Sequence, residues 1–283
     1  MNNQCIMKRF ARGVSSVGIM LLLTISIGSA QSPLKVISYN IFEGMRKDST
    51  EGKAVFSNWI KSQDPTIVAL QECNNFTQKK LEILARSYGH PYAVLLKEDG
   101  YPVALTSKFP IVAIDKVLDN MHHGFIVAKT NGINIIVLHL SPHKFWKRRE
   151  EIDVILQTVK ARQYMDGPWM LMGDFNSLSP LDSNLYADGK LIQRYQEAAK
   201  KYSFHENLVN GNAIDYTVQQ KMLDEGFIDA AYTTSPHDYS SRIDYIYISK
   251  ELKSGLIKSD FIKDDFTADR SDHRPVYLEL KAR

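Results

Sequence analysis

The residues most able to do chemistry in this chain lie where its apolar runs end. The clearest case is the tetrad Gly173-Asp174-Phe175-Asn176, which directly follows the apolar residues 169–172. Polar groups at the carboxyl end of a buried strand are where α/β proteins place reactive groups. We expect Gly173 to let the backbone turn, so that Asp174 and Asn176 leave the strand on a loop with both side chains on one side. A carboxylate beside a carboxamide can orient and deprotonate a water molecule. The alternative is a plain turn in which both side chains bond to their own backbone.

The same design recurs along the chain. Other β-type runs carry a carboxylate, an amide or an imidazole at one end, at Asn40, Glu72, His139, Asp244 and the pair Asp272-His273. If these strands share a sheet system, the polar groups gather on one rim. Several carboxylates repel one another there unless a cation lies among them. Oxygen donors of this kind suit Mg²⁺ or Mn²⁺, and also Ca²⁺.

The sequence lacks the motifs of several other common metal and catalytic sites. The chain has no His-Glu-x-x-His and no Cys-x-x-Cys motif, which disfavours zinc. It also has no Gly-x-Ser-x-Gly elbow and no Walker loop. A divalent cation bound by oxygen ligands is therefore the favoured hypothesis.

Residues 1–30 have the pattern of a secretory signal peptide. Basic residues Lys8, Arg9 and Arg12 precede the apolar segment 14–27, and the small residues 28–30 suit a cleavage site. The apolar segment is short and interrupted for a membrane span, although an uncleaved anchor is the alternative. We expect a secreted or periplasmic protein with no membrane span after cleavage.

The remaining segment, 31–283, is predicted to form one domain, since no repeat or linker divides it. The whole chain has 35 basic and 32 acidic residues, and three basic and no acidic residues precede residue 31, which leaves 32 of each. A neutral domain argues against strong non-specific binding to a polyanion but permits a local basic patch. With Cys5 removed, Cys73 has no partner and is predicted to be a small core residue. We expect a monomer without a stable protein partner.

Hydrophobic periodicity predicts a mixed α/β order of elements. The hairpin around Asn131-Gly132 is the strongest local signal, and the apolar run at 66–72 is predicted to be buried on both faces. The predicted strands are 34–41, 66–72, 92–96, 103–107, 111–117, 125–129, 133–139, 169–172, 245–248 and 276–280, and the predicted helices are 54–62, 77–88, 145–164, 183–202 and 217–225.

Six stretches together make the pattern recognisable. They are Ser38-Tyr39-Asn40, Val68-Ala69-Leu70-Gln71-Glu72, His139-Leu140, Gly173-Asp174-Phe175-Asn176, Arg242-Ile243-Asp244-Tyr245 and Ser271-Asp272-His273-Arg274-Pro275. In these residues and their order the chain resembles the endonuclease/exonuclease/phosphatase superfamily, the DNase I-like proteins. The resemblance implies a four-layer α/β sandwich, in which two mixed sheets pack face to face with helices outside. It also implies metal-dependent cleavage of a phosphate ester by water.

The resemblance further implies which residues hold the metal. Glu72 would be the principal ligand of Mg²⁺ or Mn²⁺. Asn40 would lie beside it and support the metal or a phosphate oxygen, and Asp272 would add to the metal site. The alternatives are a surface ion pair for Glu72 and ordinary turn roles for Asn40 and Asp272.

By the same resemblance, five residues would carry the catalysis. Asp174 would orient and deprotonate the attacking water, with Asn176 fixing the geometry. His139 would contact the phosphate. His273 would hydrogen-bond a phosphoryl oxygen or transfer a proton, held by Asp244. The sequence leaves open whether Asp174 or His273 is the general base.

The substrate is less defined by the sequence. Residues 141–149 mix cations with aromatic side chains, so that Lys144, Trp146 and Arg148 are candidates for a rim that stacks a base or docks a lipid headgroup. A solvated helix start is the alternative, and its basic residues oppose the helix dipole, so an anion is expected to compensate them. The pair His122-His123 either joins the rim or lies in an exposed loop. A secreted phosphodiesterase or nuclease is the favoured function. A sphingomyelinase-like enzyme, an inositol- or sugar-phosphate phosphatase and a non-catalytic binding member are the alternatives.

Overall fold

The computed structural model describes Met1 and residues 33–162, 165–235 and 241–282. The predicted signal peptide lies outside the described residues. None of the helices within them combines the length and the apolar character that crossing a membrane requires. Residues 32–283 form a compact unit.

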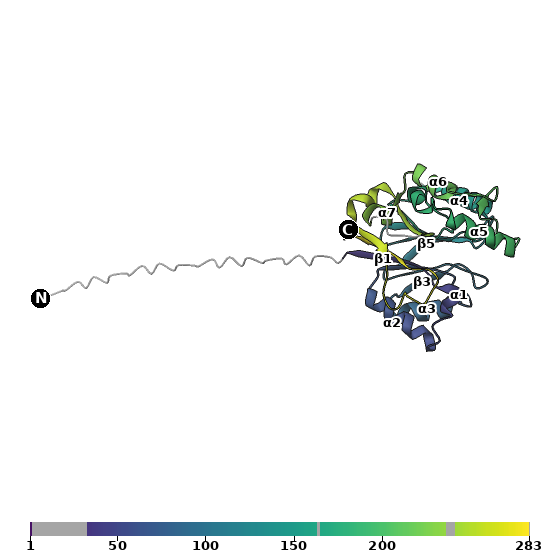
Figure 1. The fold of residues 1–283 in the computed structure, drawn as a ribbon. Coiled ribbons are helices and arrows are strands. Elements are labelled where there is room, and N and C mark those ends of the chain that lie inside the picture. Colours follow the sequence, from purple (N-terminus) through teal and green to yellow (C-terminus); the bar gives the residue numbers. More distant parts are fainter. Residues whose placement is uncertain (2–32, 163–164, 236–240, 283) are drawn as a thin grey trace. The chain divides into compact units, whose positions relative to one another are not determined.

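Two six-stranded mixed sheets form the centre of the described unit (Figure 1). The first has the order β13-β14-β1-β2-β4-β3 and consists of β1 (Leu34–Asn40), β2 (Ile67–Gln71), β3 (Tyr92–Leu95), β4 (Ala104–Ser107), β13 (Leu256–Phe261) and β14 (Val276–Leu280). The second has the order β11-β12-β8-β7-β6-β5 and consists of β5 (Ile111–Val117), β6 (Phe125–Thr130), β7 (Ile133–His139), β8 (Trp169–Asp174), β11 (Ile228–Asp229) and β12 (Asp244–Ile248). The parallel pairs are β1 with β2 and β7 with β8.

Alternation of apolar side chains along these strands builds three layers of core. Val36 joins an apolar cluster between the two sheets, whereas its neighbour Ile37 faces the helices α2 (Ala54–Gln63) and α3 (Gln78–Ser87). On the far side, the second sheet packs against α4 (Phe145–Ala161) and α6 (Thr217–Asp224). Figure 1 shows the two helix groups on opposite outer faces. The four-layer α/β sandwich predicted from the sequence is thereby confirmed.

Shorter elements connect these layers. They are the helices α1 (Phe42–Met45), α5 (Lys190–Lys201) and α7 (Ala230–Thr234), the 3₁₀ turns Glu51–Lys53, Pro180–Tyr186 and Lys250–Gly255, and the small hairpin of β9 (Leu208–Val209) and β10 (Ala213–Ile214). The helix predicted over 183–202 is in fact a 3₁₀ turn and α5, separated at Gly189, which has φ +74°. The hairpin at Asn131-Gly132 is confirmed, because both residues have positive φ and β6 pairs with β7 across them.

One prediction about the central tetrad is wrong. Gly173 does not turn the chain but continues β8, which ends at Asp174. The glycine is needed for a different reason. It pairs with Leu138 of β7, and a Cβ added at Gly173 would lie 1.9 Å from the carbonyl oxygen of Leu138. Its φ of +144° is also unfavourable for any side chain. The close approach of two strands therefore requires the glycine.

Candidate active site

Strand register brings three of the predicted residues into one row. The parallel pairing of β7 and β8 sets His139 opposite Asp174, and the antiparallel pairing of β8 and β12 sets Asp174 opposite Asp244. Asp244 is the first residue of its strand, while His139 and Asp174 are the last of theirs. Because β12 runs the opposite way, its beginning meets the ends of the other two strands.

The first sheet brings its polar residues to the same end of the sandwich. Asn40 ends β1 and pairs with Gln71 at the end of β2, so that Glu72 follows immediately beyond the sheet. The loop before β14 is fixed beside them, because the Ser271 hydroxyl donates to the Asn40 carbonyl oxygen over 2.8 Å. The backbone N–H of His273 in turn donates to the Ser271 hydroxyl oxygen.

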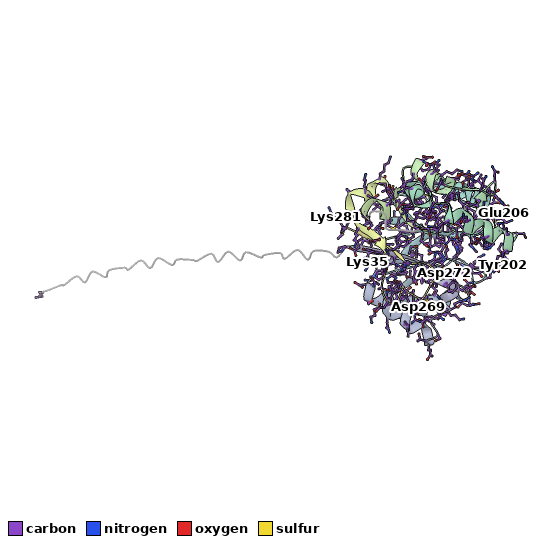
Figure 2. The ribbon with its side chains drawn as sticks, viewed as in Figure 1. Lys35, Tyr202, Glu206, Asp269, Asp272 and Lys281 are labelled. Carbon is purple, nitrogen blue, oxygen red and sulfur yellow. The ribbon has the colours of Figure 1, made fainter. Side chains whose placement is uncertain are left out.

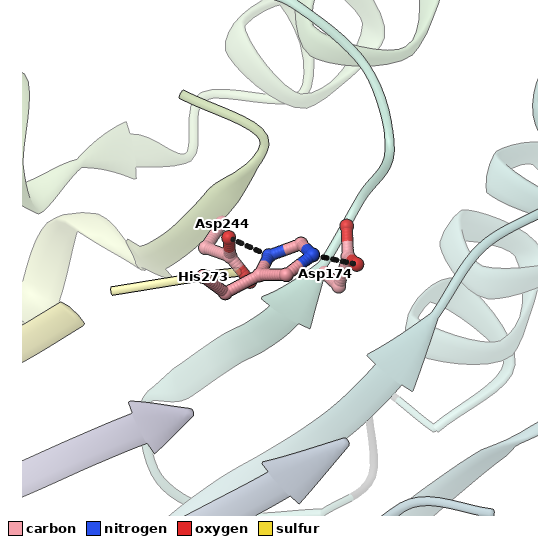
Figure 3. A group of neighbouring side chains, drawn as sticks. All are labelled: Asp174, Asp244 and His273. Carbon is pink, nitrogen blue, oxygen red and sulfur yellow. Dashed lines mark hydrogen bonds and ion pairs between the residues drawn. The ribbon is translucent and has the colours of Figure 1, made fainter. Parts of the chain in front are cut away.

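An imidazole joins two carboxylates at the centre of the site (Figure 3). His273 Nδ1 lies 2.7 Å from Asp244 Oδ2, and His273 Nε2 lies 3.8 Å from Asp174 Oδ2. Burial by itself lowers the pKa of His273, but the negative charges of Asp244 and Asp174 outweigh it and raise the pKa to about 10. The Asp174 carboxyl is buried, and burial together with the charge of Asp244 raises its pKa to about 7. The arrangement can hold a proton on the imidazole while Asp174 stays an acceptor.

Asn40 connects the two sheets through its side chain. Its amide oxygen accepts from the backbone N–H of Phe42, so its amide nitrogen is the group that faces the site. That nitrogen donates to Glu72 Oε1 over 3.2 Å and to Asp174 Oδ2 over 3.1 Å. The residue predicted to support a metal therefore contributes N–H groups, which fix the positions of two carboxylates.

Glu72 and Asn176 both have left-handed backbone conformations, with φ of +59° and +49°. Such a conformation is costly for glutamate and persists only where the surroundings impose it. Glu72 Oε2 accepts from the backbone N–H of Glu43 over 2.9 Å. The backbone N–H of Asn176 donates to Asp174 Oδ1, and its amide nitrogen donates to the Leu140 carbonyl oxygen. Asn176 thus holds Asp174 through its backbone.

These residues border a cavity of about 380 Å³, which we call the histidine cavity. Its walls include four further imidazole or aromatic side chains besides the predicted residues, and its lining is Glu72, Tyr101, His122, His123, His139, Pro142, His143, Asp174, Asn176, Asp272 and His273. The His139 ring stacks on the His123 ring with the centroids 4.2 Å apart, and His139 Nε2 lies 3.5 Å from Asp174 Oδ2. Burial lowers the pKa of His139 far below its usual value and that of His123 to about 3. This wall is therefore a set of neutral imidazoles.

Sequence reasoning missed Tyr101 and did not single out His143 within the segment 141–149. Tyr101 precedes Pro102 in a loop without any chemical motif, so nothing in the sequence singled it out. His143 lies four residues after His139, and that spacing was the available signal. His123, which sequence reasoning left between a rim and an exposed loop, is buried against His139.

The donor chemistry of this site suits a hard divalent cation. The carboxylates that line the histidine cavity are Glu72, Asp174 and Asp272, and oxygen ligands of this kind are those that Mg²⁺ and Mn²⁺ prefer. Within the described residues, three or more ligand atoms lie within 4.8 Å of one another at Asp174, Asp244 and His273. Because His273 Nδ1 and Asp244 already bond to each other, we interpret that group as a proton-holding unit. Glu72 and Asp272 then remain as the carboxylates that could hold a metal.

The predicted substrate rim has a different environment from the catalytic residues. The Lys144 ammonium lies 3.3 Å from Glu206 Oε1, and the Trp146 indole N–H donates to Glu206 Oε2 over 3.0 Å. Glu206 is exposed in the half of the domain that holds α4 and α5 (Figure 2). Arg148 is buried and donates to the carbonyl oxygen of Ser141 and the side chain of Asn207. None of the three lines the histidine cavity, and the hydrogen bonds of the buried guanidinium give us no reason to keep Arg148 as a substrate ligand.

The basic first turn of α4 finds its anions within the protein itself. Lys147 pairs with Glu150 at 3.0 Å, and Arg149 pairs with Asp215 at 2.7 Å. The compensating charge expected from the helix dipole is thus supplied by carboxylates of the same chain.

Comparison with known proteins fits this geometry. The family model described as the endonuclease/exonuclease/phosphatase family matches residues 37–273. No curated protein matches the chain by sequence.

Several solved structures share the fold. An AP endonuclease from Archaeoglobus fulgidus is 18% identical, with 88% of this chain and 100% of that chain covered and a TM-score of 0.61. A 3'-5' exonuclease from Neisseria meningitidis is 18% identical, with 88% and 100% covered and a TM-score of 0.64. A 3' phosphatase from Neisseria, solved with a product DNA hairpin, is 18% identical, with 87% and 99% covered and a TM-score of 0.61. At this level of identity the structures establish the shared fold, while the family model covers most of the chain. The chain therefore belongs to the endonuclease/exonuclease/phosphatase family.

Proposed function

We propose that the protein is a secreted, divalent-metal-dependent phosphodiesterase that cleaves its substrate by attack of water. One observation carries the proposal. Asp244, His273, Asp174, Asn40 and Glu72 form a continuous series of contacts across the ends of both sheets, each within 3.8 Å of the next. In this partly buried row one imidazole and one amide can donate hydrogen bonds and three carboxylates can accept them, beside the histidine cavity.

Glu72 and Asp272 are the residues that we assign to hold Mg²⁺ or Mn²⁺. A bound divalent ion would neutralise charge on the phosphoryl oxygens and lower the pKa of a bound water. The contacts of Asn40 support this assignment, because its amide N–H groups donate to the carboxylates of Glu72 and Asp174 and hold them at a constant separation. The polar surroundings of Glu72 are thus arranged before any ligand arrives.

We assign the general base to Asp174 and the phosphoryl contact to His273. Asp174 is an acceptor held at one oxygen by the Asn176 backbone, which leaves Oδ2 directed toward the imidazole and amide groups. His273 is bonded to Asp244 at Nδ1, so its Nε2–H is available to donate to a phosphoryl oxygen. His139 lies next to the same Asp174 oxygen and would donate a second hydrogen bond to the phosphate. General acid–base catalysis of this type contributes about 10²–10⁴ in rate.

The charges of the histidine cavity favour a diester over a monoester. A phosphodiester carries about one negative charge, whereas a phosphomonoester carries nearly two at neutral pH. The histidine cavity offers neutral imidazoles, and the nearby Lys144, Lys147 and Arg149 are engaged by carboxylates of the chain itself. Apart from His273, no side chain that is cationic at neutral pH lines the histidine cavity within the described residues, so this cavity suits the less charged substrate.

A substrate panel tests the proposal. Protein starting at Gln31 would be assayed on plasmid DNA, RNA, sphingomyelin, inositol phosphates and sugar phosphates, with Mg²⁺ or Mn²⁺ and with EDTA. We expect turnover of at least one diester, loss of turnover in EDTA, and slower turnover of every monoester. Faster turnover of a monoester would identify a phosphatase instead. If the wild type and His273→Ala were equally inert on every ester, a binding function would replace the catalytic one.

Export is tested separately. The pattern at residues 1–30 predicts that the protein recovered outside the cytoplasm starts close to Gln31. The N-terminal residue determined by mass spectrometry would check this. Recovery of the intact chain in the membrane fraction would indicate an uncleaved anchor.

A further inference from the structure

A second cavity meets the histidine cavity at the catalytic imidazole. It has a volume of about 590 Å³, and we call it the arginine cavity. Asp272 and His273 line both cavities, so the two spaces adjoin at the residue that we assign to the phosphoryl group. A group attached to the scissile phosphate can therefore extend into either space.

The arginine cavity contains three cationic side chains that come from different parts of the fold. Arg194 lies on α5, Lys263 follows β13, and Arg274 follows His273 in the loop before β14. Arg194 and Arg274 are exposed, and in the part of the chain that the structure describes no carboxylate pairs with either. The Arg194 guanidinium lies over the ring of Tyr195, which lines the same cavity, at 5.7 Å from the ring centroid. Their guanidinium groups are available to a ligand.

The other charged residues of this cavity are engaged elsewhere or lie at its boundary. Arg242 is buried and its guanidinium lies 2.6 Å from both Asp182 and Asp229, so it has a structural role. Asp244 is bonded to His273. Asp272 is the remaining carboxylate, and it lies where the two cavities meet. The interior of the arginine cavity is therefore positively charged.

The two cavities differ sharply in the ligands that they suit. One wall of the histidine cavity consists of the rings of Tyr101, His122, His123 and His139, which contact one another, and such a wall accepts an uncharged or flat group. Two guanidinium groups and an ammonium line the arginine cavity, and a guanidinium matches the oxygens of a phosphate with two parallel hydrogen bonds. A symmetric substrate would not use this difference.

We propose that the arginine cavity binds a second phosphate group of the substrate. The substrate class is then a phosphodiester with an uncharged arm in the histidine cavity and a phosphate-bearing arm on Arg194 and Arg274. This inference rests on the proposed phosphodiesterase function. A nucleotide chain and a multiply phosphorylated polyol both supply a phosphate at such a position, and the experiment distinguishes them.

A pair of substrates that differ only in the second phosphate tests the inference. The p-nitrophenyl ester of thymidine 5'-phosphate is compared with the same ester that also carries a 3'-phosphate. We expect the 3'-phosphate to raise kcat/KM of the wild type by about tenfold or more, mainly through KM, as a charge-assisted hydrogen bond does. The double variant Arg194→Gln, Arg274→Gln should bring the ratio of the two kcat/KM values close to one.

The matched control is Arg86→Gln. Arg86 is exposed on α3, pairs with Glu82 at 3.7 Å and lines neither cavity, so this variant should keep the wild-type ratio. Equal kcat/KM for the two esters in the wild type would overturn the inference. A preference for the 3'-phosphate that survived the double arginine substitution would overturn it as well.

Binding without turnover separates this inference from the proposed function. In EDTA, calorimetry should show that the wild type binds thymidine 3',5'-bisphosphate about tenfold more tightly than thymidine 5'-monophosphate, and that the double variant does not. The same comparison of inositol 1,4-bisphosphate with inositol 1-phosphate identifies a polyol as the source. If no ester is hydrolysed but the bisphosphate is bound more tightly, the proposed phosphodiesterase function is refuted, while the proposal that the arginine cavity binds a phosphate is supported. If esters are hydrolysed and neither bisphosphate is bound more tightly than its monophosphate, the proposal that the arginine cavity binds a phosphate is refuted.

Discussion

Asp244 offers the sharpest test of how the site handles protons. Its Oδ2 lies 2.7 Å from His273 Nδ1, and its charge is the foremost reason that the imidazole resists losing its proton despite burial. The change Asp244→Asn keeps the size of the side chain and removes the charge. His273 then loses both its fixed orientation and the stabilisation of its imidazolium form.

The expected loss can be bounded from general acid–base catalysis. Removing such a group costs about 10²–10⁴ in rate, and the equivalent Asp to Asn change in a serine-protease triad costs about 10⁴. This corresponds to about 3–5 kcal/mol of transition-state stabilisation. Asp244 touches the substrate only through His273, so we expect kcat to fall within this range while KM changes by less than about threefold.

The assay is release of p-nitrophenolate from bis(p-nitrophenyl) phosphate in Mn²⁺, with urea unfolding to check that the variant is folded. The control is Asp153→Asn on α4, which removes an ion pair with Lys221 from a half-exposed carboxylate. This control should leave kcat unchanged. The reasoning is refuted if folded Asp244→Asn keeps kcat within about threefold of the wild type, or if only KM rises.

Two further predictions concern stability. Gly173→Ala should destabilise the fold by about 3 kcal/mol or more in urea unfolding, because the new Cβ would meet the Leu138 carbonyl oxygen at 1.9 Å and φ would remain at +144°; a loss below about 1 kcal/mol would contradict the close approach of the two strands. His90 is buried, and burial lowers its pKa from 6.5 to about 4. As the pH falls, the unfolded chain therefore takes up the proton before the folded chain does. The free energy of unfolding should decrease by about 3 kcal/mol as the pH falls from 6.5 to about 4. Urea unfolding at pH 7.5 and pH 4.5 should show a smaller loss for His90→Gln than for the wild type, and equal losses would show that His90 does not titrate in this way.

The sequence was sufficient to predict where these strands end, but not which residues of neighbouring strands lie opposite one another. Runs of apolar and β-favouring residues indicated that β7, β8 and the strand after Asp244 exist, and motif order suggested that their ends meet. The row of His139, Asp174 and Asp244 depends on which residues pair across neighbouring strands. A shift of two residues in either pairing would preserve every local pattern and separate these side chains.

The prediction that Gly173 turns the chain was wrong for a related reason. A glycine beside polar residues indicates a turn when only its sequence neighbours are considered. The reason for this glycine lies 35 residues earlier, at the carbonyl of Leu138, and becomes visible only when β7 and β8 are paired.

The charges near the start of α4 show the same limit. Lys144 and Arg149 stand out as free cations in the sequence, whereas their partners Glu206 and Asp215 come from more than 60 residues away. The edge strand β13 was missed because only one of its six side chains is buried, so it lacks a clear apolar face.

The most direct test of the account is the metal dependence of a single rate. Metal-free wild type and Glu72→Gln would each be titrated with Mn²⁺ while p-nitrophenolate release from bis(p-nitrophenyl) phosphate is recorded. We expect Mn²⁺ to raise the wild-type rate by about 10² or more, since a divalent ion supplies several kcal/mol of charge stabilisation, and to have little effect on Glu72→Gln. A metal-free wild type as fast as the Mn²⁺-loaded protein, or a Glu72→Gln variant that responds to Mn²⁺ like the wild type, would contradict a metal-assisted phosphodiesterase centred on Glu72.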